Sequence, residues 1–272
     1  MNSPRAQQTQ PGVVQLRTVT ATRYVTPLRE GGSLPAVVEA DDDGLYVLKF
    51  RGAGQGPKAL IAELLAGEIA RAAGLAVPEI VLIELDPELA RTEPDAEIQD
   101  LIRASAGLNI ALDFLPGAVA FDPLVEPVAS GLAAAIVWVD AFVTNPDRTA
   151  RNTNLLVWHR RLWLIDHGAA LYFHHNWSAA AEASGNPFSR IKDHVLLKSA
   201  QALEEVDAAL AQRIAPRIAD IVQSIPDAWL AGEPAFTSNT EHRDAYLRVL
   251  TQRLQAPRAF VAEAIRARSM HV

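Results

Sequence analysis

Two stretches of the sequence decide the fold: residues 145–154, NPDRTARNTN, and residues 162–168, LWLIDHG. In the first, the densest polar segment of an otherwise apolar region, Asp147 is followed five residues later by Asn152. In the second, an apolar strand runs into Asp166. We predict a short hairpin between them, so that these three oxygen-bearing side chains can converge. Oxygen ligands suit Mg²⁺, and a carboxylate that is not a ligand can accept a proton from an attacking hydroxyl.

Each piece alone has an ordinary explanation, because Asp-Arg in a polar loop is commonly a solvated turn or a helix cap. The order of the pieces is more informative. Asp-x4-Asn, then a short hairpin, then a strand ending in Asp-x-Gly is the order in which protein-kinase-like enzymes place a catalytic base, a metal-binding Asn and a metal-binding Asp. The combination predicts the chemistry of phosphoryl transfer.

The first half of the chain contains a complementary cation. Residues 35–50 form a predicted β-hairpin around the turn sequence DDDG, and Lys49 lies in its second strand. A helix is predicted over 58–73 and carries Glu63 and Glu68. In kinases a strand Lys neutralises nucleotide phosphates and is held by a helix Glu. The helix is apolar nearly all round, so its helical wheel does not choose between the two glutamates, and Lys49 could instead be an edge-strand charge that opposes aggregation.

The remaining pattern is rich in strands first and in helices later, which predicts an α+β protein with two lobes. The expected strands are 13–28, 79–85, 108–115, 153–158 and 162–165, and the expected helices are 96–105, 128–143, 198–214, 216–224, 240–255 and 257–268. We expect a flexible tail over 1–12, a β-rich N-lobe with the nucleotide-binding sheet and one helix over 13–116, and a mostly helical C-lobe with the catalytic loop and metal site over 117–272.

Taken together, these motifs resemble the HipA-like kinase family, bacterial members of the protein-kinase-like superfold. The similarity runs from about residue 24 to residue 194 and rests on an ordered set of motifs: 31–35 GGSLP, 46–50 YVLKF, 63–67 ELLAG, 73–78 AGLAVP, 145–152 NPDRTARN and 165–168 IDHG. The sequence departs from ordinary protein kinases, since it has no G-x-G-x-x-G before the Lys strand and has His167 where many kinases have Phe.

The resemblance implies a role for each charged residue of the set. Lys49 would contact the nucleotide phosphates, and Glu63, rather than the second glutamate of the helix, would be its partner. Asp147 would be the catalytic base. Asn152 and Asp166 would hold Mg²⁺.

The resemblance also implies where the nucleotide lies. A turn would cover the phosphates through its backbone N–H groups, and backbone just before the lobe boundary would receive the adenine; the residues are Gly31, Gly32 and Ser33 for the turn and Asp113, Phe114 and Leu115 for the adenine. Some HipA-like proteins phosphorylate themselves on a Ser of the phosphate loop. Ser33 is similarly placed, although an ordinary turn Ser is the simpler interpretation.

Several polar residues outside this set have interpretations of their own. Arg148 and Arg151 could steady phosphate charge or bridge to carboxylates of their loop. His194 could orient the segment after Asp166. The pair His174 and His175 is expected to lie in a loop packed near the active site rather than to bind a metal.

Composition limits the other possibilities. The 272 residues include 25 Lys and Arg against 32 Asp and Glu, for a net charge of −7, so we expect no nucleic-acid partner. The longest apolar run, 131–139, is too short to span a bilayer, and the N-terminus lacks a secretory signal pattern, so we expect a cytoplasmic protein with no membrane partner.

The predicted activity is ATP-dependent, Mg²⁺-assisted phosphoryl transfer to a hydroxyl of a protein acceptor. Two alternatives remain at this point: a small-molecule phosphotransferase with the same machinery, and a nucleotide-binding regulatory pseudokinase or interaction module.

Overall fold

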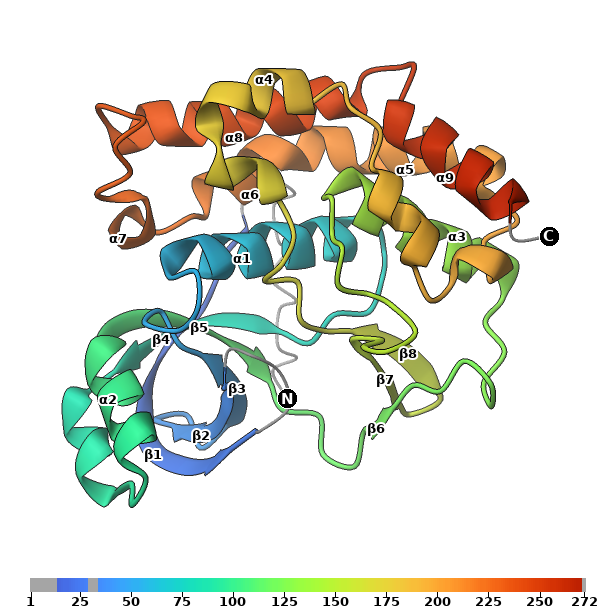
Figure 1. Cartoon of the computed structure of the whole chain (residues 1–272). Helices are drawn as coiled ribbons and strands as arrows, with labels where there is room; N and C mark the ends of the chain where they lie inside the picture. Colours follow the sequence, from blue (N-terminus) through green and yellow to red (C-terminus); the bar gives the residue numbers. More distant parts are fainter. Residues whose placement is uncertain (1–13, 29–33, 271–272) are drawn as a thin grey trace, which may run out of the picture.

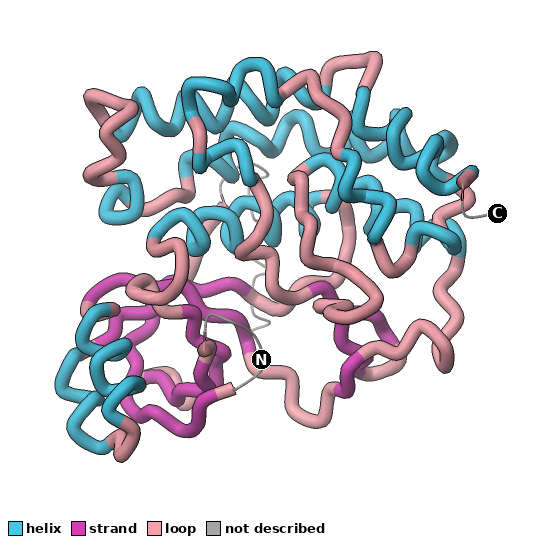
Figure 2. The backbone as a smooth tube through the Cα atoms, in the orientation of Figure 1, coloured by secondary structure: helices cyan, strands magenta, loops and turns pink. Residues whose placement is uncertain are grey.

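The computed structural model describes residues 14–28 and 34–270. The expected tail over 1–12 and the proposed phosphate turn of Gly31, Gly32 and Ser33 therefore lie outside the described residues. Figure 1 shows a β-barrel on one side of the molecule and a layered group of helices on the other. Figure 2 also shows helical segments beside the barrel and a second, smaller group of strands below the layered helices. The two-lobed α+β fold predicted from the sequence is thus present.

The first lobe is a closed barrel of five strands. In barrel order they are β1 (Thr18–Pro27), β2 (Ala36–Ala40), β3 (Leu45–Lys49), β5 (Gly107–Asp113) and β4 (Ile80–Leu85). The pair β1 and β4 is parallel and the other pairs are antiparallel. Inward-facing residues such as Val38, Leu48 and Ile83 form a separate hydrophobic core. The short helix η1 (Pro87–Thr92) and α2 (Ala96–Ala104) also contribute to that core.

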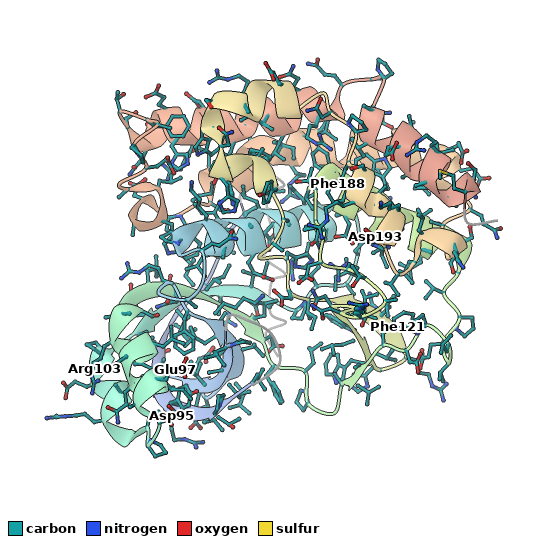
Figure 3. The ribbon with its side chains drawn as sticks, in the orientation of Figure 1. Asp95, Glu97, Arg103, Phe121, Phe188 and Asp193 are labelled. Carbon is teal, nitrogen blue, oxygen red and sulfur yellow. The ribbon has the colours of Figure 1, made fainter. Side chains whose placement is uncertain are left out.

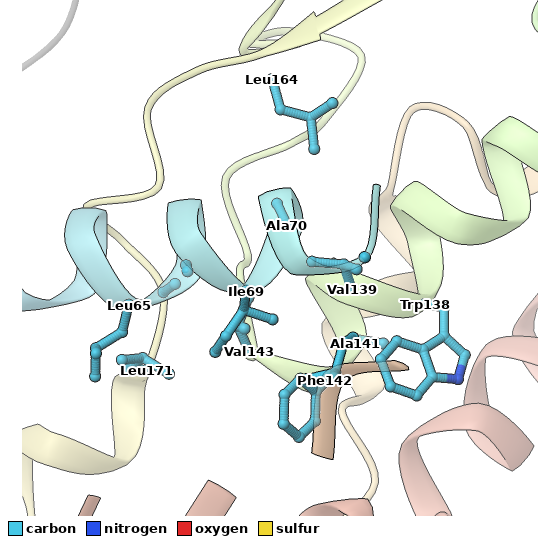
Figure 4. Packing of buried hydrophobic residues seen from close by; sticks show 14 of the residues in the cluster. Leu65, Ile69, Ala70, Trp138, Val139, Ala141, Phe142, Val143, Leu164 and Leu171 are labelled. Atoms are coloured by element: carbon cyan, nitrogen blue, oxygen red, sulfur yellow. The ribbon is translucent and has the colours of Figure 1, made fainter. Parts of the chain in front are cut away.

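Helix α1 (Pro57–Ala72) joins the barrel to the helices. It packs on Ile80 of β4 and on β5, and its other side lies against α3 (Ser130–Phe142), as the close view in Figure 4 shows. Gly67 permits the approach to the sheet, because a Cβ there would lie 2.6 Å from Ile80 Cδ1. Burial on nearly every face explains why the sequence of α1 lacks an amphipathic pattern.

The second lobe begins with a small sheet of β6 (Val119–Ala120), β7 (Leu155–Trp158) and β8 (Arg161–Leu164). The helices that follow are α4 (Ala180–Ala183), α5 (Leu203–Ile214), α6 (Ile218–Gln223), α7 (Asp227–Leu230), α8 (Asn239–Leu254) and α9 (Ala259–Ser269). Within the described part of the chain, no helix combines the length and the apolar character needed to cross a membrane.

The structure differs from the sequence-based elements in several places. The short elements η1, β6 and α7 were not predicted from the sequence. The strand expected over 13–28 begins at Thr18. The helix expected over 198–214 is divided into a 3₁₀ turn, η5 (Leu197–Ser199), and α5, which starts at Leu203. The segment between Asp166 and α5 contains further short 3₁₀ helices, η2 (Tyr172–His175), η3 (Trp177–Ala179) and η4 (Ser189–Asp193), which carry too few residues for a periodic pattern.

Candidate active site

Three charged residues from distant parts of the chain meet where the barrel faces the helices. Lys49 Nζ, at the end of β3, donates to Glu63 Oε2 of α1 at 2.6 Å and also to Asp166 Oδ1 after β8. The Glu63 side chain is fully buried, and that of Lys49 is 12% exposed, whereas that of Asp166 is 39% exposed. The site is thus a buried ion pair with one carboxylate open to solvent.

The charges of this pair stabilise one another. Burial by itself would lower the pKa of Lys49, but the charges of Glu63 and Asp166 outweigh it and raise that pKa. Burial would raise the pKa of Glu63, but the charge of Lys49 and a hydrogen bond from His167 lower it to about 2. Both groups are therefore charged at neutral pH.

The segment of Asp166 docks directly on α1. Asp166 has a positive φ of 55°. This conformation brings the next residue to Glu63: His167 N donates to Glu63 Oε2 at 2.9 Å, and His167 Nδ1 lies 3.2 Å from Oε1. His167, which replaces the Phe common in kinases, is fully buried. Both oxygens of Glu63 are thus occupied.

The two glutamates of α1 have different partners. Glu63 pairs with Lys49, whereas Glu68 Oε1 lies 3.3 Å from Arg71 Nε one turn later on the same helix. Burial raises the pKa of Glu68, which is the opposite of the shift at Glu63. The helical wheel did not show which glutamate faces Lys49. In the structure it is Glu63, which also accepts from the segment that carries Asp166.

The loop between α3 and β7 brings Asp147 and Asn152 together. Asn152 Nδ2 donates to Asp147 Oδ2 at 3.2 Å. Asn154, which the sequence analysis did not single out, donates through Nδ2 to the same oxygen at 3.3 Å and to the Asp147 carbonyl at 2.9 Å. Asp147 Oδ1 has no partner among the described residues. One oxygen of the candidate base is thus fixed and the other is open.

A buried carboxylate supports this loop from below. Asp140, on α3, accepts from Arg148 Nε at 2.6 Å, from Asn145 Nδ2 at 2.9 Å and from His194 Nε2 at 2.9 Å. Burial alone would raise the pKa of Asp140, but the charge of Arg148 and the bond from His194 hold it below its ordinary value. In the sequence Asp140 only interrupts an apolar run; an acidic residue inside a helix that is otherwise core was the signal that could have revealed it.

The proposed adenine-binding residues lie where β5 leaves the barrel. The N–H groups of Asp113 and Phe114 are already bonded, to the carbonyls of Glu79 and Leu45, both at 2.9 Å. Leu115 is buried, and its N–H has no acceptor within residues 14–28 and 34–270. Of the three backbone N–H groups, that of Leu115 is therefore the one left for a ligand.

The donor set fits Mg²⁺ that is shared with phosphates. No group of three or more His, Cys, Asp or Glu in the described ranges could enclose a metal. Asn152 and Asp166 instead supply one amide oxygen and one carboxylate that is partly open to solvent. Mg²⁺ typically takes one or two protein carboxylates and completes its octahedron with phosphate oxygens and water.

The comparison with protein families supports a kinase-type phosphotransferase. The chain belongs to the HipA-like kinase family, because the family model described as HipA-like kinase matches residues 22–260. Among curated proteins, no sequence matched significantly.

The comparison with solved structures found kinases at low sequence identity. The proinflammatory kinase CtkA of Helicobacter pylori is 13% identical, with a TM-score of 0.50 over 95% of this chain and 99% of that chain. The Golgi casein kinase with Mn/ADP bound is 13% identical, with a TM-score of 0.45 over 91% and 75% of the two chains. A second structure of the Golgi casein kinase has 11% identity and a TM-score of 0.41 over 94% and 72%. At such identities the likeness to CtkA shows the fold alone.

Proposed function

We propose that this chain transfers the γ-phosphoryl group of ATP to a hydroxyl of a protein acceptor, assisted by Mg²⁺. The observation that carries the proposal is the meeting of Lys49, Glu63 and Asp166, which places a fixed cation beside a partly exposed carboxylate. Family membership supports the reaction class, and the pairing of Asp147 with Asn152 supplies the other half of the machinery.

In this proposal each residue has one task. Lys49, held by Glu63, faces the phosphates, and Asp147 Oδ1 accepts the proton of the acceptor hydroxyl. A bond forms between the acceptor oxygen and the γ-phosphorus, and the bond from that phosphorus to the bridging β-γ oxygen breaks, which releases ADP. Asn152 and Asp166 would hold Mg²⁺, whose positive charge would offset the negative charge of the phosphates.

In the proposed function the Lys49–Asp166 contact would change when nucleotide and metal bind. Lys49 Nζ is shared between Glu63 and Asp166, and the Asp166 oxygen in that contact is a candidate metal ligand. If Asp166 served as a metal ligand, Glu63 would still hold Lys49 in place. The double pairing would therefore keep Lys49 oriented both with and without nucleotide.

Two other parts of the nucleotide site stay proposals: the phosphate turn of Gly31, Gly32 and Ser33, and the adenine contact near Leu115. The division into lobes over 13–116 and 117–272 also stays a proposal. The turn precedes β2 in the sequence, and β2 pairs with the Lys49 strand.

The test separates nucleotide binding from transfer. MgATP should raise the thermal midpoint of the wild type, chelation with EDTA should remove most of that gain, and Asp166→Ala should abolish it. Asp147→Ala should keep the MgATP-dependent shift but lose transfer of label from γ-labelled ATP to proteins of a cell extract. A wild type without any Mg-dependent ATP shift would refute the proposal.

The same experiment identifies the alternatives. If label moves to small molecules after separation from protein, the acceptor part of the proposal is wrong and a small-molecule phosphotransferase replaces it. If ATP binds but the wild type transfers no more label than Asp147→Ala, the chain is a pseudokinase.

A further inference from the structure

A buried group of three charged or polar side chains lies beneath the proposed catalytic loop and takes no direct part in the chemistry proposed above. Its members are Asp140, Arg148 and His194, whose residues are respectively 0%, 1% and 7% exposed. We call it the anchor. They come from α3, from the loop itself and from the segment after η4, so the anchor joins three parts of the second lobe.

Arg148 connects the two halves of the proposed site. It follows Asp147 directly in the chain, and its guanidinium donates to the carbonyl of Asn154 and to that of Ile165, the latter at 3.4 Å. Ile165 precedes Asp166, and its N–H donates to the same Asn154 carbonyl at 3.1 Å. The guanidinium thus lies between the backbone beside the base and the backbone beside the metal ligand.

His194 fixes the carboxylate that orients this guanidinium. Its Nδ1 accepts from the N–H of Leu196 at 3.0 Å, so the ring proton is on Nε2, which donates to Asp140 Oδ2 at 2.9 Å. Burial lowers the pKa of His194 despite the neighbouring carboxylate, which agrees with this neutral form.

The backbone beside His194 also runs along the loop. Val195 N donates to the Arg148 carbonyl at 3.0 Å, and Thr149 and His194 form an isolated antiparallel bridge. Figure 3 labels Asp193, the residue before His194, beside the loops between the hairpin and the helices.

Burying the Arg148–Asp140 ion pair costs desolvation free energy, so a role in packing alone does not account for its presence. A buried ion pair is often replaceable by apolar side chains without loss of stability, whereas removing one partner leaves an unpaired buried charge. The hydrogen bonds that Arg148 donates go to the Asp140 carboxylate and to the carbonyls of Asn154 and Ile165. These bonds therefore fix the position of the catalytic loop relative to α3 and to the Asp166 segment.

We propose that the anchor sets the distance between the base Asp147 and the metal ligand Asp166, with Arg148 as the connecting residue and His194 as the residue that positions it through Asp140. This proposal rests on the proposed function. It assigns to His194 a partner different from the one expected from sequence, since His194 acts on the loop of Asp147 rather than directly on the segment after Asp166.

The test compares two substitutions of His194. Gln can place an amide N–H near the position of Nε2 and keep the donor to Asp140, whereas Asn is too short to do so. We expect His194→Asn to lower kcat for transfer about 100-fold, because a displacement of about 1 Å costs that much. Its KM for ATP and its MgATP thermal shift should change less than twofold, and His194→Gln should recover most of kcat. His242→Asn, at a buried histidine of α8 outside the anchor, is the control and should keep kcat.

Amide hydrogen exchange gives a second readout that does not depend on transfer. In His194→Asn the N–H of Ile165 and that of His167 should exchange faster, while protection elsewhere in the second lobe is kept; in the control both should be unchanged. If His194→Asn does not fold, Arg148→Lys replaces it, since Lys keeps the charge beside Asp140 but cannot also reach both carbonyls.

The outcomes separate the two proposals. A wild type without transfer refutes the proposed function, and the exchange result alone then decides on the anchor. Equal kcat in wild type and His194→Asn refutes the anchor. A loss of kcat that His194→Gln does not recover also refutes it. Unchanged amide exchange at Ile165 and His167 in His194→Asn refutes it as well.

Discussion

Replacing Glu63 by Gln tests the central ion pair through stability. The substitution keeps the shape of a fully buried side chain but removes the charge that faces Lys49 and accepts from His167. The folded protein lowers the pKa of Glu63 from 4.5 to about 2. Because each pKa unit corresponds to about 1.4 kcal/mol, the charged form of Glu63 stabilises the fold by about 3 kcal/mol at neutral pH. Lys49 keeps Asp166 as a second partner, so we expect Glu63→Gln to cost about 2 to 3 kcal/mol.

The pH dependence and a control on the same helix sharpen this test. A carboxyl whose pKa is lowered by folding stabilises the protein above its unfolded pKa and loses that contribution as the pH falls toward its folded pKa. The difference between wild type and Glu63→Gln should thus be constant from pH 8 to pH 6 and shrink below about pH 4.5. Glu68→Gln is the control, because burial raises the pKa of Glu68 and its charge is a cost. That variant should be as stable as the wild type or slightly more stable.

Urea unfolding of the three proteins measures both effects. A loss below about 1 kcal/mol in Glu63→Gln at pH 7 would contradict the reasoning, since the pair would then contribute no more than an exposed salt bridge. An equal loss in Glu68→Gln would show that any charge removed from α1 destabilises it, and the specific role of Glu63 in holding Lys49 would be refuted.

Two further predictions concern the frame around the site. Burial keeps the pKa of His174 well below its ordinary value of 6.5, so the unfolded chain takes up a proton there before the folded one does. Stability should therefore fall by up to about 1 kcal/mol for this group as the pH drops from 6.5 to 5.5. Urea unfolding of His174→Phe should show a smaller loss over that interval, and an equal loss would count against a buried neutral imidazole. Gly67→Ala should cost about 1 to 3 kcal/mol by overpacking, because its Cβ would lie 2.6 Å from Ile80 Cδ1; a thermal midpoint equal to that of wild type would show that the helix and sheet can separate freely.

The sequence was most informative where the chemistry is carried by a local order of residues. Each piece can be recognised from its immediate neighbours in the sequence. The pieces are Lys49 on a strand, Asp147 five residues before Asn152, and Asp166 at the end of a hairpin. The β2–β3 hairpin also follows from a local signal, the Asp-Gly turn between its strands. The closure of the barrel was not predicted, because it depends on the parallel pairing of β1 with β4, which lie far apart along the chain.

The contacts that the sequence did not reveal are those between residues far apart along the chain. His194 contacts Asp140 across 54 positions, and Glu63 contacts His167 across 104. A helical wheel describes one helix, and α1 is buried almost all round, so the wheel could not show which face meets the Asp166 segment. Arg148 was expected to steady phosphates or to bridge carboxylates of its own loop; its carboxylate partner instead comes from α3.

The net charge of −7 and the proposed polyphosphate ligand are consistent because of how the cation is arranged. Lys49 is the cation that the described structure places against both Glu63 and Asp166, so most of its charge is already balanced before any nucleotide arrives. In the proposed site, three phosphates would then meet the carboxylates of Asp147 and Asp166 beside an ammonium that is already paired. In the proposed function the nucleotide would therefore bind together with Mg²⁺. Asp166 would then serve as a ligand of the metal, and the Lys49 ammonium, still paired with Glu63, would face the phosphates. This is why the EDTA arm of the thermal experiment is as informative as the Asp166→Ala variant: both remove the same source of positive charge, one from solution and the other from the chain.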